Sequence, residues 1–120
     1  MEIILSKKKR IKFIAPKRIP EANVQAEIYR KLINRGIYCV LEYRMKVPEY
    51  GNHLRADVAV IVDGYVSCLV ECKSRVNGKV NVNGRQYKKY ESVGLPTIYC
   101  MCFDDVDECL SEIIRIIKWQ

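Results

Sequence analysis

The sequence predicts a single α/β domain, a mixed β-sheet flanked by helices in the order α-β-β-β-α-β-α. At 120 residues the chain has the length of one domain. Apolar residues recur at helical spacing within 21–35, and the apolar runs 55–62 and 66–73 flank an Asp-Gly turn. A last apolar run, 95–103, follows a polar stretch, so we expect it to return to the sheet through a helical crossover.

The first helix follows Pro20, and Gly36 supplies its stop. A strand over 37–47 ends at Pro48, because proline lacks the N–H that a sheet ladder needs. The other expected elements are the hairpin strands 55–62 and 66–73, an extended piece over 79–82, a helix over 85–93, a strand over 95–103 and a helix over 104–119. Acidic residues begin that last helix and basic residues end it, as the helix dipole favours.

Positive charge is concentrated at the N-terminus. The net charge is +7, and residues 1–20 hold seven of the 21 basic residues but one acid. We therefore expect a basic arm or edge strand over 1–20, followed by the domain proper over 21–120. Such an arm attracts polyanions, nucleic acid above all, although a solubilising tail is the alternative. The residues expected to hold phosphates are Lys7, Lys8, Lys9, Arg10 and Lys12.

Composition narrows the class of protein. The sequence has no apolar run near the roughly 20 residues that span a bilayer, and its start lacks the order of a signal peptide, so we expect a cytoplasmic protein without membrane contact. Most of the six cysteines lie in apolar runs, which predicts reduced, buried thiols. A structural metal or iron–sulfur cluster is the less favoured alternative, because no C-x-x-C pair is present.

The candidate chemistry lies on the predicted hairpin. Glu71 and Lys73 end an apolar strand and share one face, while Asp57 is enclosed by apolar residues on the preceding strand. Buried charges need a partner, a metal or a functional reason. The alternative is a salt-bridged Glu71–Lys73 pair on a half-exposed strand.

Hairpin register decides whether these residues meet. With a plain two-residue turn at Asp63 and Gly64, Asp57 would oppose Val70 and point away from Glu71. An odd-length loop or a β-bulge would place Asp57 on the face of Glu71. We expect one of these two. Two carboxylates and a lysine would then converge, a combination suited to Mg²⁺ and phosphodiester hydrolysis.

Asp57 followed by Glu71-Cys72-Lys73 resembles the D…ExK signature of the PD-(D/E)XK nucleases. The resemblance covers roughly residues 21–103 and implies a restriction-endonuclease-like core. It also implies that Asp57, Glu71 and the backbone carbonyl of Cys72 bind Mg²⁺ or Mn²⁺, and that Lys73 serves the attacking water.

In that family a helix glutamate often contacts the metal through water. Glu27 is the best match, and Glu21 or Glu42 could fill the role instead. Gln86 and Tyr90, one helical turn apart, resemble the Q-x-x-x-Y element of RecB-type nucleases. Similarity extends to the short archaeal Holliday-junction resolvases and to virus-type repair nucleases.

The sequence departs from the family pattern at three points. Ala56 replaces the usual proline before the aspartate, which the family tolerates, and the glycine-rich loop of the resolvases is missing. The cysteine spacing also does not match RecB-like members that carry an iron–sulfur cluster.

The resemblance implies an endonuclease that cuts branched or specific DNA in repair, in recombination or in a mobile element. Besides the basic arm, the expected DNA-binding residues are Arg55, Arg75, Arg85 and Tyr90. So small a domain leaves little surface for reading sequence, so we expect a homodimer or higher homo-oligomer. The alternatives are an inactive nucleic-acid-binding module with the same fold and a subunit of a larger complex.

Overall fold

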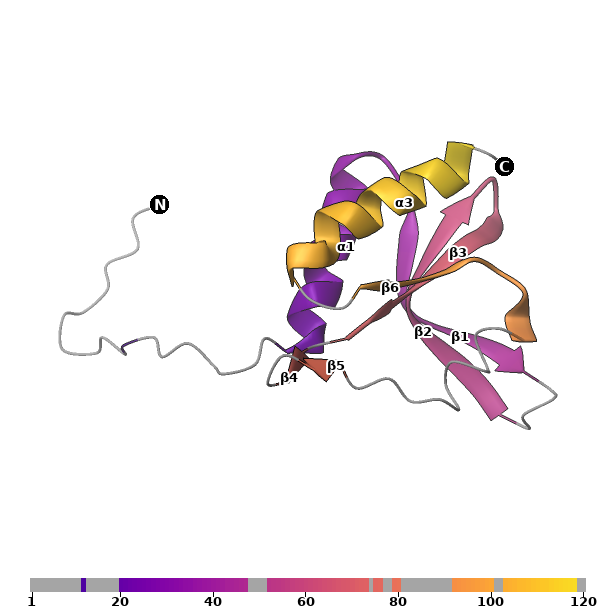
Figure 1. Cartoon of the computed structure of the whole chain (residues 1–120). Helices are drawn as coiled ribbons and strands as arrows, with labels where there is room; N and C mark the ends of the chain where they lie inside the picture. The colour runs from indigo at the N-terminus through magenta and orange to yellow at the C-terminus, as the bar shows by residue number, and fades with distance from the viewer. Residues whose placement is uncertain are drawn as a thin grey trace, which may run out of the picture.

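The structure is a computed structural model that describes residues 12, 20–47, 52–73, 75–76, 79–80, 92–100 and 103–118. A helix is followed by three long strands, a small hairpin, a further strand and a closing helix (Figure 1). The elements are α1 (Glu21–Asn34), β1 (Cys39–Val47), β2 (Asn52–Val62), β3 (Tyr65–Cys72), β4 (Arg75–Val76), β5 (Lys79–Val80), β6 (Thr97–Cys100), η3 (Phe103–Asp105) and α3 (Val106–Lys118).

The main sheet has four strands in the order β1-β2-β3-β6. The first three form an antiparallel meander, and β6 pairs with β3 in parallel. The presence of both antiparallel and parallel pairs confirms the predicted mixed sheet. The parallel pair requires a crossover connection between β3 and β6. β4 and β5 pair separately. Most of the helix expected over 85–93 lies outside the described residues.

Both helices cover the same face of the sheet (Figure 1). Val24, Ile28 and Leu32 of α1 are fully buried, as their four-residue spacing predicts. They join buried residues of α3 and the inward-facing side chains of the strands in one apolar core. On the opposite face a smaller cluster gathers Leu54, Ala56, Ala59 and Leu69.

The β2–β3 hairpin closes through a two-residue turn. Val62 pairs directly with Tyr65, and the turn residues Asp63 and Gly64 have φ values of +52° and +82°. Two successive positive φ angles define the turn whose twist matches that of the strands, and aspartate followed by glycine is its usual sequence. The odd-length loop is therefore not what sets the register.

No helix among the described residues is long and apolar enough to span a membrane. The five cysteines within the described ranges are buried and form no disulfide, in agreement with the prediction of reduced thiols. Cys102 lies outside the described residues.

Candidate active site

A β-bulge brings Asp57 to the same place as Glu71. The register between β2 and β3 shifts between Val60 and Ile61, so that Ser67 is an extra residue on β3. One extra residue exchanges the two faces of a strand relative to its neighbour. Of the two routes expected from the sequence, the bulge is the one used.

The Asp57 carboxylate lies where β2 and β3 stop pairing. The ladder ends at Val58 and Val70, and Asp57 Oδ2 then accepts a hydrogen bond of 2.8 Å from the backbone N–H of Cys72. The side chain of Glu71 is close enough to act on the Asp57 carboxyl group. Two acidic groups from neighbouring strands thus share one site.

The shared site changes the acidity of Asp57. Burial and the negative charge of Glu71 together raise the pKa of Asp57 to about 7, against a smaller lowering by the N–H of Cys72. Two carboxylates this close cannot both ionise easily without a cation. The pair therefore favours either a proton or a metal ion between its oxygens.

Glu71 and Lys73 are buried at the end of β3, with exposed fractions of 3% and 9%. Lys73 Nζ lies 3.2 Å from Glu71 Oε1. The backbone N–H of Lys73 donates to the carbonyl of Cys100 at 2.8 Å, which fixes the strand end against β6. The pair expected under the simpler alternative does form, but it is buried rather than half-exposed.

Helix α1 contributes Gln25, which the sequence analysis missed. Its Nε2 donates to the Asp57 backbone carbonyl at 3.0 Å and to Glu42 Oε1 at 3.3 Å. Glu42 adopts a φ of +54° at the point where β1 passes Asp57. A left-handed glutamate within a strand is uncommon, and such strain is often found at functional sites.

Glu27 is not brought to this site. Its carboxylate pairs with Arg30 at 2.6 Å, and that hydrogen bond lowers the pKa of Glu27. Glu21 lies one helical turn before Gln25, on the same face of α1, and its charge acts on Cys72. Of the helix carboxylates, Glu21 is thus better placed than Glu27.

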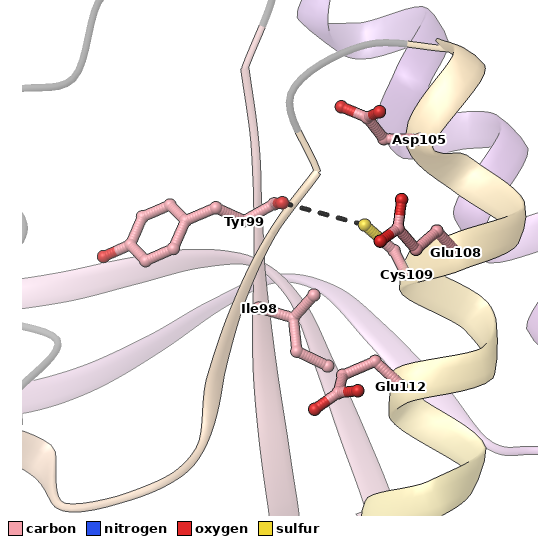
Figure 2. A pocket seen from close by; sticks show the side chains of 6 residues that line it. All are labelled: Ile98, Tyr99, Asp105, Glu108, Cys109 and Glu112. Carbon is pink, nitrogen blue, oxygen red and sulfur yellow. Dashed lines mark hydrogen bonds between the residues drawn. The ribbon is translucent and has the colours of Figure 1, made fainter.

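Tyr99 is a second neighbour that the sequence did not reveal. It stands beside Glu71 in the parallel β3–β6 register, and its phenol oxygen is buried. Figure 2 shows the ring pointing away from α3, while the Tyr99 carbonyl accepts a 3.7 Å hydrogen bond from Cys109 Sγ. The phenol therefore lies on the side of the sheet that Glu71 faces.

The remaining predicted site residues fall into three groups. Arg55 and Lys12 are exposed, and Arg55 Nε pairs with Glu42 Oε2 at 2.9 Å. Arg75 begins β4, but its side chain lies outside the described set. The others that lie outside the described residues are Lys7, Lys8, Lys9, Arg10, Arg85, Gln86 and Tyr90.

The two carboxylates of this site can supply part of the ligand shell of a hard divalent cation. Within the described segments, no group of three or more His, Cys, Asp or Glu side chains is arranged to hold a metal ion. Mg²⁺ commonly uses one or two carboxylates and completes its shell with water and substrate phosphate. Asp57 and Glu71 can supply these two carboxylates. The repulsion between them contributes to the raised pKa of Asp57, and a bound cation would offset that repulsion.

A separate pocket of about 300 Å³ lies between β6 and α3 (Figure 2). Its lining includes three acidic side chains, those of Asp105, Glu108 and Glu112, together with the thiol of Cys109. These charges repel phosphate, so the pocket is a poor place for a DNA backbone.

No protein-family model, no curated protein and no solved structure matches this chain.

Proposed function

We propose that this protein is a metal-dependent nuclease that hydrolyses DNA phosphodiester bonds on a restriction-endonuclease-like core. The observation that carries the proposal is that Asp57 Oδ2 accepts a 2.8 Å hydrogen bond from the Cys72 N–H, next to Glu71, while Lys73 Nζ lies 3.2 Å from Glu71. The order of one helix, three antiparallel strands and a parallel fourth strand also supports it.

In this proposal Asp57 and Glu71 hold Mg²⁺ or Mn²⁺, together with the backbone carbonyl of Cys72. A metal ion held there would supply Lewis acidity to the phosphate and to the attacking water. The Cys72 N–H and Gln25 orient Asp57, through its carboxylate and its carbonyl respectively. The Lys73 ammonium orients the attacking water and offsets negative charge that develops on the phosphoryl oxygens.

The direct test is cleavage of supercoiled plasmid with Mg²⁺, with Mn²⁺ and with chelator. Wild type should nick or linearise the plasmid only with metal, and Asp57→Ala and Lys73→Met should lower the rate at least a hundredfold. Glu112→Ala, in the separate pocket between β6 and α3, is the matched control and should cut like wild type. Wild type that cuts nothing with either metal would end the enzyme proposal.

A second experiment identifies which form of DNA is the substrate. An endonuclease for branched DNA should cut a four-way junction faster than linear duplex or single strands. Light scattering with and without DNA should show a homodimer or higher homo-oligomer, since a small domain needs two copies to grip two duplex arms.

One observation favours a second candidate, an inactive nucleic-acid-binding module. The Glu71–Lys73 ion pair already balances two buried charges without a metal. Under that candidate, Lys73→Met would leave DNA affinity unchanged, and no metal would produce cleavage.

A further inference from the structure

Basic side chains face one another across the outer half of the β1–β2 ribbon. Arg44 pairs directly with Arg55, and Lys46 pairs with His53 in the same antiparallel register. Residues two apart in a strand share a face, so these four side chains form one group. All four residues are exposed. We name this group (Arg44, Lys46, His53 and Arg55) the basic ladder.

Without a bound ligand, the basic ladder destabilises the β1–β2 ribbon. Like charges directly opposite each other destabilise a sheet. The segments 43–47 and 52–56 contain no Asp or Glu that could alternate with the bases. Glu42 pairs with Arg55 at the inner end, 2.9 Å away, but Arg44 and Lys46 extend outward from it. An anion bound along the ribbon would remove this repulsion.

The inner end of the basic ladder adjoins the candidate active site. Arg55 is two residues from Asp57 along β2, so their Cα atoms are roughly 7 Å apart. Glu42 connects the two regions, since it pairs with Arg55 and its charge acts on Asp57. An extended polyanion lying on the ladder would therefore run toward the carboxylate pair.

We propose that the basic ladder binds the phosphate backbone of duplex DNA and guides it to Asp57 and Glu71. The choice of DNA rests on the proposed nuclease function. An acidic membrane is the less suitable polyanion, because surface binding needs exposed apolar side chains beside the bases. On this ribbon the alternate residues Met45 and Leu54 pack into the apolar cluster of the sheet instead.

The test measures affinity for a fluorescent DNA duplex in EDTA, over a range of salt concentrations, so that cleavage plays no part. Each phosphate contact contributes about 0.9 to the slope of log K against log salt. The double variant Arg44→Gln/Lys46→Gln should reduce the slope by about 1.8, which corresponds to about a 30-fold loss of affinity at 0.15 M salt. The control Arg35→Gln/Lys118→Gln removes the same charge elsewhere and should leave the slope unchanged.

A second variant separates binding from folding. Arg44→Glu places opposite charges across the ribbon beside Arg55, so its melting temperature should equal or exceed that of wild type while DNA affinity falls. Equal loss of slope in ladder and control variants would overturn the proposal, as would tighter binding to phosphatidylserine vesicles than to DNA. DNA binding is measured without metal, so it does not depend on cleavage. If the ladder variants lose slope as expected but wild type cuts no DNA, only the proposed nuclease function is refuted.

Discussion

Replacing Asp57 with asparagine should stabilise the metal-free protein while it abolishes cleavage. Asparagine keeps an oxygen that can accept the hydrogen bond from the Cys72 N–H, and it removes one of the two competing negative charges. A carboxylate pair that is unfavourable for folding is retained where it serves a bound ion or substrate. Stability and activity are therefore expected to change in opposite directions.

The size of the effect follows from the pKa of Asp57, about 7 in the folded protein. The unfolded value is about 4. Three pKa units correspond to about 4 kcal/mol as an upper limit, and solvent screening of this partly exposed group reduces that to about 1–2 kcal/mol. For a domain of this size each kcal/mol shifts the melting temperature by about 4–8 °C.

The effect must depend on pH, with a defined sign. Because the folded pKa is raised, the folded state binds more protons than the unfolded state between about pH 4 and pH 7, and wild-type stability falls as pH rises through that window. Asp57→Asn should thus melt about 5–10 °C above wild type at pH 8.5 and close to it at pH 5.

Thermal melts by circular dichroism at the two pH values, in EDTA and in 10 mM Mg²⁺, provide the assay. Asp63→Asn makes the same chemical change in the exposed hairpin turn and should show no such pH-dependent gain. Mg²⁺ should raise the melting temperature of wild type but not of Asp57→Asn, since a ligand stabilises the state that binds it. A variant less stable than wild type at pH 8.5 would refute the charge-pair reasoning.

Three further predictions follow from the same geometry. Gln25→Ala removes two side-chain hydrogen bonds, so it should lower the free energy of unfolding by about 1–2 kcal/mol in urea titrations and slow cleavage, whereas full activity would show that Asp57 needs no support from α1. Glu21→Gln should raise the Mg²⁺ concentration for half-maximal cleavage and Glu27→Gln should not, and the reverse result would restore Glu27 as the metal-linked glutamate. Gly64→Ala forces a side chain into the left-handed region at φ +82°, so it should cost about 1 kcal/mol by chemical denaturation, and an unchanged midpoint would contradict the turn geometry.

Local patterns in the sequence predicted most of the fold correctly. The spacing of apolar residues located α1 to within one residue of its end, and aspartate followed by glycine located the hairpin turn. Charge order along α3 matched the helix dipole. Each of these signals depends on residues close together in the chain, so a single sequence reveals it.

The candidate site was predictable only as a set of residue types. Glu71 and Lys73 share a face by strand periodicity alone. Asp57 joins them only because the register shifts between Val60 and Ile61, and the sequence left that choice between a loop and a bulge open. A single residue more or less exchanges the faces of a strand, and no periodic pattern encodes that count.

The tertiary structure alone decided which distant residues surround the carboxylates. Parallel pairing of β3 with β6 places Tyr99 beside Glu71, and the position of α1 against the sheet brings Gln25 to Asp57 in place of Glu27. The opposition of Arg44 and Arg55 likewise appears only in the register of two strands. These contacts join segments far apart in the chain, so they depend on how whole elements pack, whereas the elements themselves depend on short-range spacing and charge.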